Sequence, residues 1–342
     1  MKEIQNKTKT NFIKKLFIKL CRILGYEIID QNKFYIPTSE KSINDTISIQ
    51  GQRSINLPLG EVKITRKVKS LDIIIRTCAS VNMLTQNKDR IFQKDKIDYI
   101  LRSINSILRS IDYAMQNHSN ISFNILIVDY NSSKENLHKI KSLLENSGKI
   151  FKILNLDILE FENRIKKINQ KNERSTSKQL SNMCNIYKSL ELSKASNDLI
   201  YFVEDDYIHK IESISEMIFT YERIASLTSN ELILCPSDYP YLYAKASNTK
   251  IFLGENYHWR KVDETLCTFL MSKKTIEKHW KKLINMCEIE HYPFESPLHE
   301  IYKEELCISP VPSLAVHFTN INSIFGLSPN IDWQKLWDEN KN

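Results

Sequence analysis

Short apolar runs that alternate with helical patterns constrain the fold of this 342-residue chain more than any other feature of its sequence. The runs are four to six residues long and rich in Ile, Leu and Val, which is typical of strands buried on both faces of a parallel sheet. They cover residues 71–76, 123–128, 151–154 and 199–203. The intervening helical patterns cover residues 97–116, 134–146 and 176–195. This alternation predicts an α/β protein with a doubly wound sheet whose strands are mainly parallel.

The pattern changes after residue 208. Two further helices are predicted over 211–227 and 273–286, and they flank short β segments at 232–235, 251–253 and 265–271. Because strands and helices no longer alternate strictly here, the sheet is expected to be mixed rather than purely parallel.

Three acidic residues, Glu204, Asp205 and Asp206, directly follow the apolar run 199–203. Ligands bind at the carboxyl ends of strands in open α/β sheets, so these carboxylates are expected at a ligand site. Adjacent carboxylates repel one another, and oxygen ligands at this density suit Mg²⁺ or Mn²⁺. The sequence therefore predicts a divalent metal at this point, and the alternative is a solvated acidic turn.

Glycine is scarce in this chain. It has 6 glycines, and no two of them form G-x-G-x-x-G or G-x-x-x-x-G-K-[ST]. A dinucleotide-binding fold needs glycines so that the backbone can approach the pyrophosphate, and a P-loop needs them to cradle phosphates. If this sheet binds a nucleotide diphosphate, a metal held by carboxylates is the simplest means of neutralising the phosphates.

Three segments, LDIIIRTCAS, NILIVDYNSS and SNMCNIYKSLELSKASNDLIYFVEDDY, resemble in their order the core of family 2-type glycosyltransferases of the GT-A fold. The resemblance covers about residues 71–325 and implies an enzyme that uses a nucleotide-diphosphate sugar. By this likeness Thr77 lies near the nucleotide, Asp129 contacts the base or ribose, and Asp206 binds the metal with Glu204. The cluster is Glu-Asp-Asp rather than a strict D-x-D, which leaves open which two carboxylates face the metal.

We count three further side chains with the donor site, namely Arg76, Asn185 and Asp205. For Arg76 and Asp129 the sequence leaves alternatives open, a surface ion pair and a strand-end cap.

A run of flat and hydrogen-bonding side chains includes Trp259 and Arg260. Such groups suit stacking on a sugar and contact with a phosphate, and we count both residues with the donor site. The alternative is a satellite packing cluster.

The last third of the chain supplies a histidine and two acids. His317 ends the apolar run 310–317, and a late histidine completes the metal shell in many GT-A enzymes, so the resemblance makes it a third metal ligand. Transfer with inversion needs a carboxylate that takes the proton from the acceptor hydroxyl. Glu300 is the first choice for this base and Glu295 the second. The alternatives are a structural histidine and acids that cap a helix.

These features together predict a metal-dependent glycosyltransferase with an inverting mechanism. Its partners would be a nucleotide-diphosphate sugar donor and a glycan or lipid-linked acceptor, as in the synthesis of surface polysaccharides. One rival is a sugar-nucleotide nucleotidyltransferase, although residues 78–82 lack the glycine and basic residues usual in its first loop. A second rival is a non-catalytic binding module with the same fold.

Four regions follow from these patterns. Residues 1–30 are expected to form a basic amphipathic helix, and 31–67 a linker or small appended region. Residues 68–206 would form the half that binds the nucleotide sugar, and 207–342 the half that binds the acceptor.

The N-terminal helix carries Lys15, Lys19 and Arg22 along one stripe beside an apolar stripe. A helix of this kind can lie in the surface of an anionic membrane, or it packs on the catalytic domain as an ordinary helix. No apolar run reaches the roughly 18 residues needed to span a bilayer, and no signal peptide is recognisable.

Charge and cysteine content add two expectations about partners and location. The net charge of +7 is modest, and the basic residues are scattered, which argues against nucleic acid as a partner. The 7 cysteines form no C-x-x-C, so we expect reduced thiols in a cytoplasmic protein, peripheral on the inner face of the membrane if the helix binds lipid.

Overall fold

The computed structural model describes residues 12–26, 63–81, 90–244, 249–319 and 323–341. The chain divides into two compact units, Met1–Glu61 and Val62–Asn342. The described part of the first unit is helix α1 (Phe12–Ile23) and the three residues after it. The predicted linker over 31–67 lies outside the described residues apart from 63–67.

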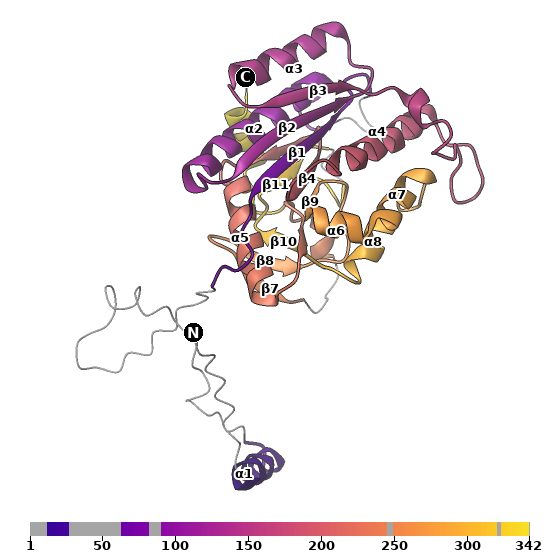
Figure 1. Cartoon of the computed structure of the whole chain (residues 1–342). Coiled ribbons are helices and arrows are strands. Elements are labelled where there is room, and N and C mark those ends of the chain that lie inside the picture. Colours follow the sequence, from indigo (N-terminus) through magenta and orange to yellow (C-terminus); the bar gives the residue numbers. More distant parts are fainter. Residues whose placement is uncertain (1–11, 27–62, 82–89, 245–248, 320–322, 342) are drawn as a thin grey trace. The chain divides into compact units, whose positions relative to one another are not determined.

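The second unit contains a nine-stranded sheet in the order β3-β2-β1-β4-β9-β6-β10-β8-β7 (Figure 1). The parallel half comprises β1 (Ser70–Thr77), β2 (Ser122–Asp129), β3 (Phe151–Asn155) and β4 (Leu199–Glu204). The mixed half comprises β6 (Leu232–Leu234), β7 (Ile251–Leu253), β8 (His258–Lys261), β9 (Phe269–Ser272) and β10 (Leu306–Val311). Only β8 and β9 run against the common direction of this sheet. The predicted α/β fold with mainly parallel strands is confirmed.

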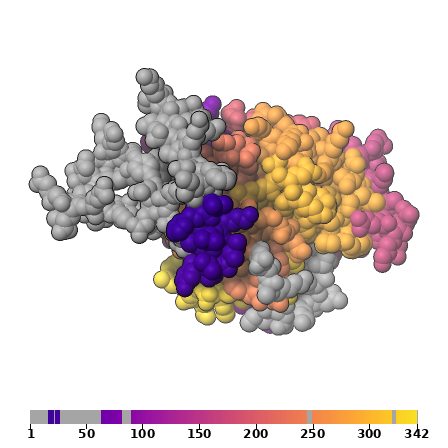
Figure 2. All heavy atoms as spheres, turned by 90° about the horizontal axis from the view of Figure 1, so that it is seen from below, coloured from indigo at the N-terminus to yellow at the C-terminus, as the bar shows by residue number. Residues whose placement is uncertain are grey.

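Helices cover both faces of this sheet, so the doubly wound arrangement is confirmed as well (Figure 1). On one face α2 (Lys96–Asn117) packs against α3 (Lys134–Asn146) and α5 (Ser213–Thr228). On the other face α4 (Ser177–Ser193) packs against α7 (Trp280–Glu288), which in turn packs against α8 (Ser296–Tyr302). Figure 2 shows that the later part of the chain, coloured salmon to yellow, forms much of the lower surface of the unit.

The strand order creates a crevice between β1 and β4. The chain runs outward from β1 to β2 and β3, and then returns to form β4 on the other side of β1. All residues of β1 are buried, as expected for a strand with helices on both of its faces. At such a switch point the loops leave in opposite directions, and the crevice at the carboxyl ends of the two strands is a usual ligand site.

A small second sheet brings the end of the chain back to this crevice. Two residues separate the end of β4 from strand β5 (Tyr207–His209), which pairs with β11 (Ala315–His317) in antiparallel register. In that register His317 lies opposite Tyr207, beside the turn formed by Asp205 and Asp206. The final helix α9 (Trp333–Glu339) packs against β5.

Two predicted elements differ in length from the observed ones. The helix expected over 273–286 is divided into α6 (Lys273–Lys278) and α7, because the non-helical backbone at His279 separates them. The strand expected over 265–271 begins only at Phe269. Among the helices of the described chain, none has the length and apolarity that crossing a bilayer requires.

Candidate active site

A cavity of about 400 Å³ opens at the carboxyl ends of β1 and β4. Its walls come from the ends of these strands, the first half of α4, the segment 290–295 and the end of β11. Among its lining residues are Arg76, Thr77, Asn185, Glu204, Asp205, Asp206, Glu295 and His317. The sequence predicted all eight as site residues.

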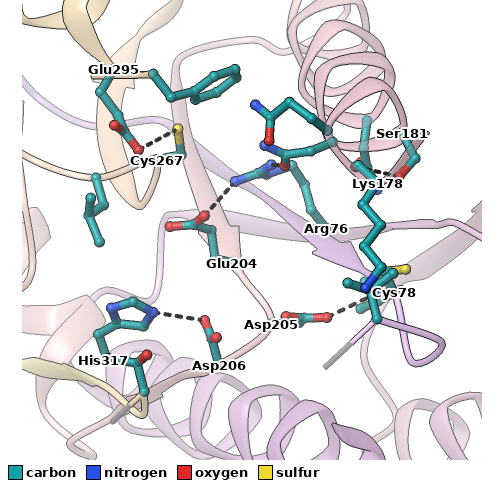
Figure 3. Close-up of a pocket in the computed structure, with 18 of the residues that line it drawn as sticks. Arg76, Cys78, Lys178, Ser181, Glu204, Asp205, Asp206, Cys267, Glu295 and His317 are labelled. Atoms are coloured by element: carbon teal, nitrogen blue, oxygen red, sulfur yellow. Dashed lines mark hydrogen bonds and ion pairs between the residues drawn. The ribbon is translucent and has the colours of Figure 1, made fainter. Parts of the chain in front are cut away.

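Each carboxylate of the acidic triplet has a basic partner of its own. Figure 3 shows the three acids leaving the end of β4 in different directions. Glu204 pairs with Arg76 at 3.0 Å, and Asp205 pairs with Lys96 at 2.5 Å while also accepting the backbone N–H of Cys78 at 3.0 Å. Asp206 pairs with Arg90 at 2.7 Å. For Arg76 the sequence left a surface ion pair open as the alternative. Arg76 does form an ion pair, but the pair is buried, since the Arg76 side chain is only 7% exposed.

Burial and these partners shift the pKa values of two acids in opposite directions. Burial raises the pKa of Glu204, and Arg76 offsets this only in part. Burial acts the same way on Asp206, but Lys96, His317 and Arg90 together lower the pKa of that carboxyl well below its ordinary value. Asp206 is therefore ionised across the whole physiological pH range.

His317 faces Asp206 from the end of β11, with 3.5 Å between its Nε2 and the carboxylate Oδ1 (Figure 3). Its Nδ1 lies 2.8 Å from the carbonyl oxygen of Phe325, and its ring stacks on Tyr207 at 4.7 Å. A carbonyl only accepts, so Nδ1 carries a hydrogen. Burial lowers the pKa of His317, but the carboxylates of Asp206 and Glu204 raise it above its ordinary value, so an ion bound at Nε2 would have to displace a proton. His317 thus lies beside the acidic triplet, as a third metal ligand would have to, and its role as a ligand stays a prediction.

This arrangement provides two of the ligands that a divalent ion would need. A ring fixed by an Nδ1–H bond to a backbone carbonyl, with the other nitrogen left to face an ion, is the usual setting of a metal-binding histidine. Within the described part of the chain, no group of three or more His, Cys, Asp or Glu side chains is arranged to hold a metal. Asp206 and His317 therefore fit an ion that takes its remaining oxygens from a diphosphate and water, as Mg²⁺ commonly does.

The donor-side residues are held by a network at the ends of β1 and β2. Asp129 is fully buried and accepts hydrogen bonds from Thr77 Oγ1 at 2.7 Å and from Ser132 Oγ at 2.6 Å. These two hydrogen bonds make Asp129 a strand-end cap, which is the alternative that the sequence left open. The expectation that Asp129 itself contacts the base or ribose is therefore corrected. Its neighbour Tyr130 lines the cavity instead.

Asn185 reaches the cavity from α4. Its Nδ2 donates to the carbonyl of Val128 at 3.0 Å, which fixes the amide plane. Its Oδ1 is buried and has no hydrogen-bond partner within the described residues. A buried acceptor without a partner is costly, so a ligand donor at this point would stabilise the site.

The two candidate bases lie in different environments. Glu295 lines the cavity next to Cys267, whose Sγ lies 3.8 Å from Oε1 (Figure 3). Burial, reinforced by the charge of Glu204, raises the pKa of Glu295 to about 7. Glu300 is exposed on α8, where it pairs with Lys303 at 2.5 Å. The first choice for the base is therefore corrected, because Glu300 is on the solvent side of its helix and Glu295 is in the cavity.

Trp259 and Arg260 also require a correction. Both lie in β8, where Trp259 is fully buried and its Nε1 donates to Glu216 at 3.1 Å. Arg260 pairs with Asp238 and lies over the ring of Tyr243. These contacts form the packing cluster that the sequence left as the alternative.

The sequence interpretation missed three basic residues in the site. Arg90 and Lys96 contact the acidic triplet, and Lys178 lines the cavity from the first turn of α4. Lys96 is adjacent to the start of the predicted helix over 97–116, so its position at the sheet edge could have been inferred. Arg90 follows no regular pattern, and the sequence gives no signal for it.

Comparison with known proteins gives only distant likenesses. No model of a protein family matches this chain, and no curated protein matches it. The chain is similar to TarS of S. aureus, with 12% identity and a TM-score of 0.35, over 61% of this chain and only 29% of TarS. It is also similar to the mannosyltransferase PcManGT from Pyrobaculum calidifontis, a structure in complex with GDP-Man and Mn²⁺, with 12% identity and a TM-score of 0.35, over 68% of this chain and 56% of that one.

A third likeness is to an active-site mutant of the galactosyltransferase LgtC, with 11% identity and a TM-score of 0.37, over 79% of this chain and 94% of LgtC. Likenesses at this level do not carry the substrates or site residues of those proteins over to this chain.

Proposed function

We propose that this chain is a glycosyltransferase of the GT-A type, similar to family 2, that moves a sugar from a nucleotide diphosphate to a hydroxyl acceptor. The observation that supports this most is the cavity at the β1–β4 switch point. It joins ionised Asp206 and His317 to the basic residues Arg90 and Lys96, and it holds a second acid, Glu295, with a pKa of about 7. Such a pairing of an ionised acid with a neutral one suits two different catalytic roles.

The donor would bind with its diphosphate near Arg90 and Lys96. Arg90 and Lys96 are almost fully buried, with side chains 5% and 8% exposed. Charges in such a setting interact more strongly with a phosphate than they would in water. The free Oδ1 of Asn185 would accept a hydrogen bond from the nucleoside, and the ring of Tyr130 would border the base.

A divalent ion, Mn²⁺ or Mg²⁺, would be held by Asp206 and His317, with Glu204 as a further carboxylate nearby. The chemistry that such an ion supplies is charge stabilisation on the departing nucleoside diphosphate. Arg90 and Lys96 keep Asp206 ionised and oriented, so that its carboxylate is available without prior loss of a proton.

The reacting hydroxyl would lose its proton to Glu295. As the acceptor oxygen bonds to the anomeric carbon, the bond from that carbon to the phosphate oxygen breaks, and the configuration inverts. A carboxyl with a pKa of about 7 is half ionised near neutral pH and is well matched to this proton transfer.

A nucleotide screen tests this proposal against its two rivals. The protein is incubated with nucleoside diphosphates and their sugars, with and without Mn²⁺, and thermal stability and diphosphate release are measured. Stabilisation by a diphosphate sugar together with its turnover supports the transferase. Consumption of a nucleoside triphosphate with a sugar 1-phosphate would indicate a nucleotidyltransferase, and binding without any turnover would indicate a binding module.

The N-terminal helix supports a location on the inner membrane face. In α1 the side chains of Leu16, Phe17 and Leu20 are more than half exposed, and Lys19 is exposed as well. An apolar stripe beside basic residues binds anionic lipid surfaces.

We expect deletion of residues 1–30 to abolish co-sedimentation with phosphatidylglycerol vesicles while leaving nucleotide binding unchanged. High salt should weaken the binding of the full chain, since charges are screened over about 8 Å at physiological ionic strength. Equal sedimentation of both forms would contradict the proposal.

A further inference from the structure

An exposed tyrosine stands on the cavity wall close to the candidate base. Tyr292 is 57% exposed, lines the cavity and precedes Glu295 by three residues. Single exposed aromatic residues are common on protein surfaces. What distinguishes this one is that the segment carrying it is fixed by a part of the chain more than a hundred residues away.

The side chain of Gln170 provides the fixing contacts. Its Oε1 accepts the backbone N–H of Tyr292 at 3.1 Å, and its Nε2 donates to Nδ1 of His291 at 2.9 Å. The other ring nitrogen of His291 donates to the carbonyl of Asn285 at 2.9 Å. Since a carbonyl only accepts, Nε2 of His291 carries a hydrogen. The hydrogen bonds of the Gln170 and His291 side chains hold the segment 291–292 in this conformation.

Backbone pairing reinforces this position. Glu290 donates its N–H to the carbonyl of Ile168 at 3.1 Å and accepts the N–H of Gln170 at 3.0 Å. Its carboxylate accepts the hydroxyl of Tyr292 at 3.0 Å. The tyrosine ring is therefore presented to the cavity by a prearranged wall, so that a ligand would not have to order it.

We propose that Tyr292 is the stacking face for the acceptor and that the acceptor is an uncharged pyranoside. This inference rests on the proposed function and names the substrate class of the same site. The C–H face of a pyranose ring fits the negative face of an aromatic ring. The carboxylates of Glu290 and Glu295 both line this part of the cavity and accept hydrogen bonds from sugar hydroxyls. The charge of the Glu290 carboxylate, joined by that of Glu295 in its ionised form, repels an acceptor that carries a phosphate.

The test compares Tyr292→Ala with Tyr292→Phe, which keeps the ring and removes only the hydroxyl. The acceptor probes are methyl and octyl glycosides of glucose, galactose and mannose, and glycerol 3-phosphate represents phosphate-bearing polyols. Tyr292→Ala should raise the acceptor KM by about tenfold, the loss expected for one stacking contact, and Tyr292→Phe should stay within about twofold of the wild type. Donor hydrolysis in the absence of acceptor should be the same in all three proteins, since Tyr292 contacts no donor group in this scheme.

The outcomes separate the two proposals. Absence of donor binding and hydrolysis in the wild type would reject the glycosyltransferase itself. Normal donor hydrolysis with an unchanged acceptor KM in Tyr292→Ala would reject only the role of Tyr292. Preference for glycerol 3-phosphate over all the pyranosides, or no stimulation by any pyranoside, would reject the acceptor class.

Discussion

Replacement of Asp206 is expected to abolish metal-dependent binding of nucleoside diphosphates and to lower sugar transfer by roughly 10²–10³-fold, the usual effect of removing one electrostatic stabiliser from an active site. The carboxylate contacts Arg90, Lys96 and His317, which hold its pKa well below the ordinary value although burial raises it. A diphosphate that enters the site brings about two more negative charges, and these are repelled by the remaining acids unless a cation is bound.

The variant of choice is Asp206→Asn, because it retains the size of the side chain and one of its oxygens. Both Asp206→Asn and Asp206→Ala remove the negative charge that Arg90 and Lys96 share, and loss of one partner from a buried ion pair typically costs 3–5 kcal/mol of stability. Only Asn keeps an oxygen that can still accept a hydrogen bond from Arg90, so its cost should be the smaller. The matched control is Asp98→Asn, since Asp98 is a partly exposed acid outside the cavity that pairs with Arg102 at 3.6 Å on α2. The control should bind and turn over the donor like the wild type.

Calorimetric titration with a nucleoside diphosphate, with Mn²⁺ or with EDTA, provides the measurement. The wild type should bind with Mn²⁺ and lose affinity in EDTA, whereas Asp206→Asn should bind weakly in both. His317→Ala should show a smaller loss, because a neutral nitrogen ligand contributes less charge than a carboxylate. Wild-type affinity in Asp206→Asn would refute the metal role. Tight binding in EDTA would assign charge neutralisation to Arg90 and Lys96 instead.

The parts of this site that the sequence predicted are those determined by backbone position. An apolar strand that runs directly into acids must deliver them to the carboxyl edge of the sheet, and Glu204, Asp205 and Asp206 lie there. His317 follows the same logic, since it ends a short strand that pairs with β5 immediately after the acids.

Glu300 shows how a simple periodicity could have prevented an error. In α8 the buried residues are Pro297, Leu298, Ile301 and Tyr302. Successive residues of a helix are about 100° apart, so this apolar stripe puts Glu300 on the opposite, solvent-facing side. Glu295 precedes the helix as its N-cap, so the helical periodicity does not determine the direction of its side chain.

Other features depend on tertiary contacts that no local pattern contains. The indole of Trp259 and the guanidinium of Arg260 are groups that often bind ligands. In the fold, however, both are used in contacts with Glu216 and Asp238, which are distant in the sequence. The basic partner Arg90 belongs to no helix or strand, and its contact with Asp206 spans 116 positions.

Replacement of Glu295 by Gln is expected to have the second large effect, a fall in turnover of roughly 10²–10⁴-fold, which is the usual contribution of a general base. Donor affinity should hardly change, because the amide has nearly the same size and the carboxylate contacts the acceptor side. The matched control is Glu300→Gln, an identical change on exposed α8 five positions later, and it should retain full turnover.

The pH dependence of turnover and stability, compared between the wild type and Glu295→Gln, gives the more specific test. The pKa of Glu295 is raised from 4.5 to about 7, so wild-type turnover should rise with pH up to about 7 as the base loses its proton.

The stability of the wild-type fold should fall over the same pH range in which turnover rises. The fold favours the protonated carboxyl, and this contribution is lost as pH rises from about 4.5 through 7, at a cost of up to about 3 kcal/mol at higher pH. A Gln side chain cannot ionise, so Glu295→Gln should be more stable than the wild type at pH 8 although it is far less active. Thermal unfolding and initial rates measured from pH 5 to 9 would reveal this opposition. If Glu295→Gln kept the wild-type pH–rate profile, another group would be the base. If it were less stable than the wild type at pH 8, the raised pKa would be wrong, because removal of a charge that is costly to bury must stabilise the folded state.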